Sequence, residues 1–189
     1  MNGPRGRSFV TTAQRITFTA LFIALGLLLP MAFHMIGSGT VFLPMHIPIL
    51  LAGFLAGPGV GLVTGLIVPG LSHVLTGMPP LAPIPIAILM TFELATFGLV
   101  AGLLYHILRW SIFPSLLGSM IVGRAVYGFV FAYMLPLFGI PTPPITVWLP
   151  ASLATSWPGI VIQIIVVPSI VAATSRMPLF TRLRGASRI

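Results

Sequence analysis

The chain alternates long apolar runs with short segments rich in Gly, Pro, Ser and Thr. A helix needs about 20 apolar residues to cross the roughly 30 Å of hydrocarbon in a bilayer. Marking such runs, with Pro and Gly clusters as boundaries, predicts six transmembrane helices, at about 16–36, 46–57, 59–77, 84–108, 112–138 and 147–174. The second run is short for a full crossing. We expect it to be tilted, or to continue past Gly57-Pro58-Gly59 into the third.

Composition supports a membrane protein. Hydrophobic residues form 57% of the 189 residues and charged residues only 5%, against roughly 45–50% and about 25% in soluble domains. A water-facing surface cannot be built from such a chain. The absence of Cys excludes disulfides, thiolate metal sites and a cysteine nucleophile. We therefore expect an all-α, multi-pass protein of the cell membrane, with a single transmembrane domain over 1–189.

The net charge of +8 arises from nine arginines and a single acid, Glu93. Most of the arginines flank the apolar runs, at Arg5, Arg7, Arg15, Arg176, Arg182, Arg184 and Arg188. Arg109 falls in the turn between the fourth and fifth predicted helices. Because basic residues gather on the cytoplasmic side of membrane proteins, we expect both termini to be cytoplasmic. This placement also argues against nucleic-acid binding.

Two charged residues lie within predicted helices. At 1.5 Å per residue, Glu93 on the fourth helix and Arg124 on the fifth both fall about 14–18 Å from the outer surface. Ionisable groups in hydrocarbon usually face the bundle interior and pair with each other. We predict a Glu93–Arg124 interaction. It either fixes the helix register or meets a polar ligand in a wet outer cavity, and both alternatives stand.

Helical spacing collects further polar and aromatic groups around this pair. Tyr127 is one turn from Arg124, Thr96 is one turn from Glu93, and a polar stripe follows one face of the sixth helix. Such groups bind a ligand, or hydrogen-bond helix to helix. The candidate substrate-binding residues are Glu93, Arg124, Tyr127, His46, Thr96, Trp157, Ser156 and Gln163. Trp157 is the deeper stacking candidate, whereas Trp148 is placed like an interfacial belt residue.

Small residues recur every four positions. Gly53, Gly57, Gly61 and Gly65 continue this spacing across the second and third helices, and Ala20 and Ala24 set it on the first. Such stripes let helices approach closely in lipid, either within the bundle or at a docking face for a partner.

Motifs for catalysis are missing. The chain has no Walker A sequence, no G-x-S-x-G and no paired carboxylates, so it cannot hydrolyse ATP itself. Ser72 and His73 are adjacent, and adjacent helical residues do not face each other. His34, His46 and His73 lie near outer helix ends without a carboxylate at hand, so we expect loop or pocket-mouth roles and no metal. His106 is expected at the cytoplasmic interface. We expect no cofactor.

Several segments together resemble the substrate-binding S components of energy-coupling factor (ECF) transporters, over nearly the whole chain. The segments are MHIPILLAGF at 45–54, Gly57-Pro58, Gly61 to Gly65, Pro69, Ser72, TGMPP at 76–80, FELAT at 92–96 and Gly98 to Tyr105. The A-x-x-x-A stripe of that family is matched by Ala20 and Ala24 on the first helix.

The resemblance implies one subunit of an ATP-driven (ABC) importer. Such a subunit captures a small water-soluble vitamin at its outer face, beneath a gating loop that here contains Ser38, Gly39 and Thr40. It then delivers the vitamin together with a transmembrane coupling subunit (the T component) and two cytoplasmic ATPases. Ala20 and Ala24 would face the coupling subunit. The Met1-Asn2 start lacks the Met-His stretch of the cobalt and nickel importers.

An arginine in the pocket favours a carboxylate-bearing ligand, because the planar guanidinium matches a carboxylate and stays charged. Pantothenate is the first choice, and riboflavin, folate, niacin, pyridoxine, a thiamin precursor and cobalamin remain open. Two other classes also remain: an intramembrane enzyme using His73, Ser72 or Glu93, and a stand-alone secondary carrier or channel. Against the carrier, the chain shows no convincing inverted repeat.

Overall fold

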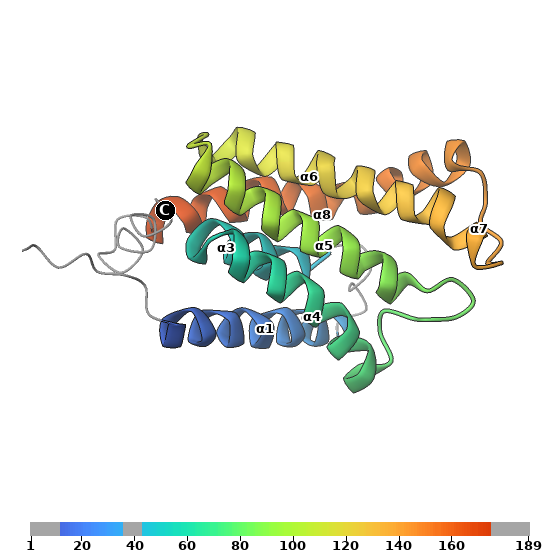
Figure 1. Ribbon diagram of the computed structural model, residues 1–189, viewed down its shortest axis with the longest axis horizontal. Helices are drawn as coiled ribbons and strands as arrows, with labels where there is room; N and C mark the ends of the chain where they lie inside the picture. Colours follow the sequence, from blue (N-terminus) through green and yellow to red (C-terminus); the bar gives the residue numbers. More distant parts are fainter. Residues whose placement is uncertain (1–11, 36–42, 175–189) are drawn as a thin grey trace, which may run out of the picture.

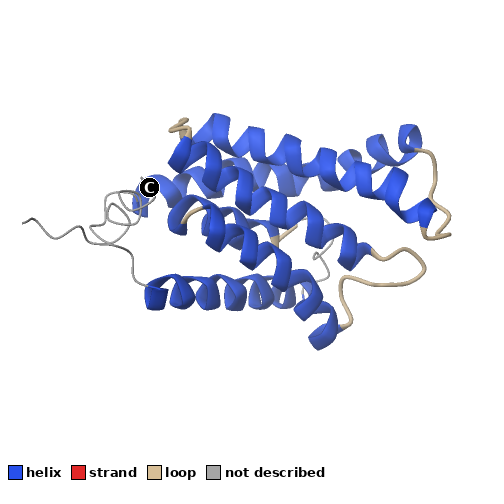
Figure 2. Ribbon diagram, in the orientation of Figure 1, coloured by secondary structure: helices blue, strands red, loops and turns tan. Residues whose placement is uncertain are grey.

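The computed structural model describes residues 12–35 and 43–174, with the backbone alone for His34 and Met35. All regular structure in this part of the chain is helical (Figure 2). The elements are α1 (Thr12–Met35), α3 (His46–Ala56), α4 (Pro58–Thr76), α5 (Ile86–Gly102) with its π-helical continuation η1 (Leu103–Ile107), α6 (Ile112–Phe129) with η2 (Val130–Met134) and α7 (Leu135–Leu137), and α8 (Ile145–Thr174).

The helices form one bundle in which consecutive segments run in opposite directions (Figure 1). The start of α1 and the end of α8 lie at the same end of this bundle, and the loops at 77–85 and 138–144 lie at the other end. This arrangement agrees with an even number of passes. Which end is cytoplasmic stays a prediction from the arginines.

Five helical segments are long and apolar enough to cross a membrane, and α3 is a shorter apolar helix. The expected all-α membrane protein is therefore confirmed, while six full crossings remain a prediction. The observed ends lie close to the expected ones. The largest difference is in α1, which begins at Thr12 instead of Ile16.

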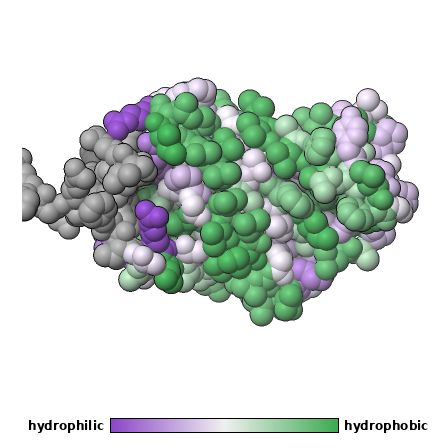
Figure 3. All heavy atoms as spheres, viewed as in Figure 1, coloured by the Kyte–Doolittle hydropathy of each residue, from purple (hydrophilic) through white to green (hydrophobic). Residues whose placement is uncertain are grey.

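The outer surface of the bundle is apolar, as Figure 3 shows for one face. Large hydrophobic side chains point outward on several helices, among them Leu28, Val74 and Ile121, which are 61%, 78% and 70% exposed. Soluble proteins rarely expose contiguous apolar surface on this scale. In a bilayer the same side chains contact lipid, so the surface suits a membrane protein.

Glycines bring α3, α4 and α5 into close contact. A Cβ atom at Gly53 or at Gly61 would overlap the backbone of Gly98 on α5, and one at Gly65 would overlap the backbone at Leu94. Small residues allow this approach, which dispersion forces then stabilise in lipid. Of the two interpretations of this glycine stripe, packing within the bundle is the one that the structure supports.

His106 differs from its expected interfacial position. It lies in the π-helical element η1 and is buried in the bundle, at 6% exposure. Its Nε2 is 2.8 Å from the carbonyl oxygen of Phe54 on α3, and its ring meets that of Tyr105 edge to face. His106 therefore joins α5 to α3 instead of facing the membrane surface.

Candidate functional site

The predicted pair of buried charges is present. Arg124 on α6 places Nε 3.3 Å from Oε1 of Glu93 on α5. His46, the first residue of α3, places Nε2 3.9 Å from Oε2 of the same carboxylate. Glu93 and His46 are almost completely buried, at 2% and 1% exposure, and Arg124 is 19% exposed. Three helices thus each bring one ionisable group to a single point in the bundle.

The approach of α5 to α6 beside this cluster depends on Gly123. A Cβ atom at Gly123 would overlap the ring of Phe97 and come within 3.1 Å of the Glu93 carbonyl oxygen. Phe97 lies one turn beyond Glu93, and the His46 ring meets it edge to face at 5.4 Å. Gly123 and Phe97 therefore allow α6 to approach α5 closely enough for Arg124, the residue after Gly123, to contact the Glu93 carboxylate.

A cavity of about 570 Å³ lies above the cluster, at the end of the bundle opposite Thr12 and Thr174. We call it the outer cavity, after the predicted orientation. The ends of α1 and α4, the start of α3, the loop around Pro79 and the outer part of α8 enclose it. Besides the three charged or titratable side chains, its polar lining consists of Tyr127, Ser72, Thr76, Ser152, Thr155 and Ser156.

Several hydroxyl groups in this lining already donate their protons to backbone carbonyls. Ser156 Oγ is 2.6 Å from the Ser152 oxygen, Ser72 Oγ is 2.8 Å from the Met78 oxygen, and Thr76 Oγ1 is 2.8 Å from the Ser72 oxygen. A hydroxyl that donates its one proton keeps its lone pairs as acceptors. Donors for a ligand must then come chiefly from Arg124, Tyr127 and His46 and from backbone N–H groups.

Tyr127, which lines the outer cavity, belongs to an aromatic stack. Trp148, in the first turn of α8, stacks on Tyr127 with ring centroids 4.8 Å apart and on Phe131 at 4.7 Å. The guanidinium carbon of Arg124 lies 5.8 Å from the Tyr127 ring centroid. Trp148 is partly exposed at this end of the bundle, so its expected belt role stays a prediction beside these ring contacts. Sequence reasoning missed this stack, since its members are far apart in the chain.

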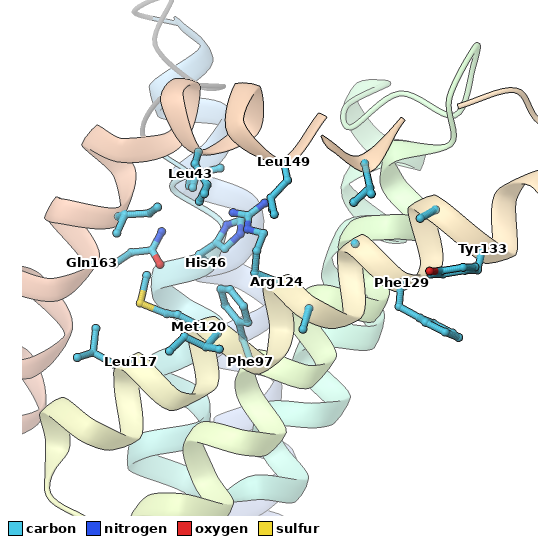
Figure 4. Close-up of a pocket in the computed structure, with 17 residues that line it drawn as sticks. Leu43, His46, Phe97, Leu117, Met120, Arg124, Phe129, Tyr133, Leu149 and Gln163 are labelled. Atoms are coloured by element: carbon cyan, nitrogen blue, oxygen red, sulfur yellow. The ribbon is translucent and has the colours of Figure 1, made fainter. Parts of the chain in front are cut away.

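A second cavity, of about 640 Å³, lies between α6 and α8 (Figure 4). We call it the side cavity. It shares Leu43, His46 and Arg124 with the outer cavity, and its other lining is apolar apart from Gln163 and Tyr133. Gln163 is fully buried and points from α8 toward His46 and Arg124 (Figure 4).

Two of the expected substrate-binding residues lie away from both cavities. Trp157 is 61% exposed on the outside of α8. It follows Ser156, which faces the outer cavity, and successive helical residues are turned by about 100°. Thr96 donates its hydroxyl proton to the Phe92 carbonyl at 2.7 Å and lines neither cavity. One turn after Glu93, the position that faces the bundle interior is that of Phe97 instead.

The small-residue stripe of α1 faces outward. Ala20 and Ala24 are exposed, whereas Phe22 and Gly26 on the opposite side of the helix pack into the bundle. Packing within this bundle therefore does not explain the two alanines. The expected gating residues, Ser38, Gly39 and Thr40, lie outside the described residues.

Ser72 and His73 do not form a catalytic pair. Ser72 Oγ donates to the Met78 oxygen, and His73 Nδ1 is 2.8 Å from the Pro79 oxygen, so both side chains anchor the loop after α4. His73 thus has the loop-carbonyl contact expected from the sequence. Among the residues that the structure describes, no three His, Cys, Asp or Glu side chains come close enough together to hold a metal ion.

Together these features define a class, a multi-pass membrane protein with a charged cavity inside its helical bundle. The family described as "ECF transporter, substrate-specific component" matches residues 14–171, which is most of the chain. The protein belongs to this family and is a substrate-binding subunit of an ECF transporter in the cell membrane. Subunits of this kind belong to transporters and are not enzymes. No curated protein matches the chain.

Proposed function

We propose that this subunit captures a small, carboxylate-bearing vitamin or related micronutrient in the outer cavity and delivers it with a T component and two ATPases. The observation that carries the proposal is Arg124, whose guanidinium reaches a polar cavity within the membrane. Arginine binds carboxylates through paired, charge-assisted hydrogen bonds, which are the strong ones. The cavity volume of about 570 Å³ suits a small organic ligand.

The start of α3 adds a second positive element to the same cavity. Leu43, Pro44, Met45 and His46 line it, and Met45 gives the helix no side-chain cap. The N-terminal N–H groups of a helix have no partner within it and carry the positive end of its dipole. An anion held by Arg124 would therefore also meet the N-terminus of α3, an arrangement that commonly binds carboxylates and phosphates.

Glu93 neutralises Arg124 when no substrate is bound. The 3.3 Å contact joins Oε1 of Glu93 to Nε of the arginine, and the same guanidinium also lines the outer cavity. Among the described residues, Oε1 of Glu93 has no partner that meets hydrogen-bond geometry, which marks this contact as an ion pair instead of a well-formed hydrogen bond. A carboxylate ligand can then bind to Arg124 without displacing Glu93 completely.

Pantothenate is our first choice of substrate. Its carboxylate suits Arg124, and its hydroxyl groups suit the acceptor oxygens of Ser72, Ser152 and Ser156 in the lining. Tyr127 would cover one side of the bound molecule. The loop containing Ser38, Gly39 and Thr40 is proposed as the gate.

The exposed face of α1 is proposed as the docking surface for the T component. Ala20 and Ala24 present small side chains to the membrane, so a helix of a partner could approach the α1 backbone closely. This proposal takes its support from the exposure of both alanines while their neighbours Phe22 and Gly26 pack inward.

Isothermal titration of the purified full-length protein with pantothenate tests the binding site. We expect Arg124→Met to weaken binding at least 100-fold, because the carboxylate loses its charged partner. Arg109→Met, which removes an exposed arginine in the turn after η1, is the matched control and should bind like the wild type. Equal binding by Arg124→Met and the wild type would contradict the proposed site.

Uptake into proteoliposomes tests the transport role. Radiolabelled pantothenate should accumulate when the protein is reconstituted with a T component, both ATPases and ATP. The protein alone should bind pantothenate but accumulate very little of it. Accumulation by the protein alone would favour a stand-alone secondary carrier.

A further inference from the structure

Gln163 is an unusual residue for its position. It lies on α8 between Pro158 and Pro168, is fully buried, and its helical neighbours Ile160 and Val167 are apolar. Neither its amide nitrogen nor its amide oxygen has a hydrogen-bond partner among the described groups. Burying an amide without partners opposes folding, and an apolar side chain of similar size would avoid that cost. Gln163 therefore lowers the stability of the ligand-free protein.

His46 faces the same space. Neither of its ring nitrogens has a hydrogen-bond partner in the described part of the chain, Nε2 lying 3.9 Å from Oε2 of Glu93, and the ring lines the side cavity together with Gln163. Figure 4 shows Gln163 extending from α8 toward the part of the cavity where His46 and Arg124 lie. An amide offers a donor and an acceptor, and so does a neutral imidazole. The pair therefore complements an uncharged group that both donates and accepts hydrogen bonds.

We propose that Gln163 and His46 form a second substrate subsite, in the side cavity, that binds an uncharged amide, hydroxyl or heterocyclic group. This inference rests on the proposed function, because it concerns another part of the same bound molecule. Apolar side chains such as Phe97 and Met120 line the cavity beside the subsite. They suit the carbon skeleton of a ligand but provide no further hydrogen bonds.

The two cavities meet at Leu43, His46 and Arg124, which line both. A molecule whose carboxylate is bound by Arg124 can therefore extend past His46 to Gln163. The substrate class that fits is a bipartite one: an anionic group at one end, a neutral hydrogen-bonding group at the other, and an apolar portion between them. A simple fatty acid satisfies only the first of these two polar sites.

The test combines ligand-free stability with direct binding. The full-length protein and its Gln163→Leu variant are titrated with pantothenate, nicotinate and folate, which carry a carboxylate and a neutral polar group, and with octanoate, which carries only the carboxylate. We expect Gln163→Leu to weaken the tightest binder of the first three at least tenfold and to leave the octanoate titration unchanged. The variant should unfold at the same or a higher temperature than the wild type without ligand, because the unpartnered amide is gone.

Ser115→Ala is the matched control. Ser115 is likewise buried with an unpartnered side-chain oxygen, but it lies in the first turn of α6 and lines neither cavity. Its binding of all four compounds should equal that of the wild type. If Gln163→Leu fails to yield folded protein, Gln163→Met replaces it with the same expectations.

Two results would overturn different claims. If the wild type binds one of the three bipartite compounds and Gln163→Leu binds it within twofold, the subsite is wrong and the proposed function stands. If the wild type binds none of the four compounds, the carboxylate-binding function itself is wrong, and the subsite is wrong with it. A lower unfolding temperature of Gln163→Leu with unchanged binding would assign the glutamine a purely structural role.

Discussion

Removing the charge of Glu93 while keeping its shape tests the ion pair at the centre of the site. Glu93→Gln is nearly isosteric, so packing against Phe97 and Gly123 is preserved and the change is electrostatic. In the variant, Arg124 faces the carboxamide 3.3 Å from Nε in place of a carboxylate. Its positive charge is then uncompensated in a largely buried position. We expect the ligand-free protein to be less stable and its affinity for carboxylates to be kept or raised.

The expected size of the effect follows from the geometry. Two unit charges 3.3 Å apart attract each other by about 5 kcal/mol at an effective dielectric constant of about 20. Breaking a buried pair by removing one partner typically costs about 3–5 kcal/mol. Arg124 is 19% exposed, which places the expected loss near the lower end, at about 3 kcal/mol. For a chain of this length, that loss corresponds to roughly 10 °C in the unfolding temperature.

Thermal unfolding of the detergent-solubilised, ligand-free protein measures this loss. The double variant Glu93→Gln/Arg124→Met removes both charges, so it should recover at least about 2 kcal/mol relative to the sum of the two single losses. Arg109→Met, which alters an exposed arginine, should unfold like the wild type. If Glu93→Gln unfolds at the wild-type temperature, or if the two single losses simply add in the double variant, the argument for a stabilising ion pair fails.

Three further predictions concern packing and docking. Gly61→Ala should destabilise the protein by about 1–3 kcal/mol in thermal unfolding, because a Cβ there overlaps the α5 backbone. Gly59 has open space around it, so Gly59→Ala should not, and equal stability of the two variants would contradict the close helix contact. The double variant Ala20→Leu/Ala24→Leu should bind pantothenate normally yet fail to copurify with the T component, and an intact complex would refute the docking face. In thermal unfolding, Trp148→Ala should lower the stability by about 1–3 kcal/mol, because two ring contacts are lost, and Trp148→Phe should lower it much less. Similar losses of stability in the two variants would contradict a stabilising role of the stacked rings.

The helical elements follow from the sequence because apolar length and Pro or Gly boundaries are local signals. The break between α3 and α4, for example, falls at Gly57, whose φ of 97° favours glycine and ends one helix just before Pro58 begins the next. The glycine stripe was recognised but not explained. Its spacing is the same for a contact within the bundle and for one with a partner, and only the position of α5 distinguishes them.

The sequence predicts the part of the candidate site in which burying a charge has a high free-energy cost. Glu93 and Arg124 are the two charges inside predicted helices, and hydrocarbon leaves such charges little choice except to pair. Two other expected site residues do not line a cavity, and for them the free energies of facing lipid and facing the bundle interior differ little. Trp157 and Thr96 are tolerated equally at a lipid-facing or an inward-facing position, so one turn of spacing did not decide between them. The stack of Trp148 on Tyr127 depends on how α8 crosses α6, which no local pattern encodes.

The short length of α3 explains why the site lies inside the bundle instead of at its surface. With 11 residues, α3 spans about 16 Å, roughly half of what the 22 residues of α5 and η1 cover. Its far end is fixed at the turn by Gly57, where Gly102 packs against Pro58. Its N-terminus must therefore stop part-way along its neighbours, at the level of Glu93, and none of the helices in residues 12–35 and 43–174 fills the space above it. A full-length second helix would occupy that space, so the shortness of α3 creates the outer cavity and places the positive end of a helix dipole at its floor.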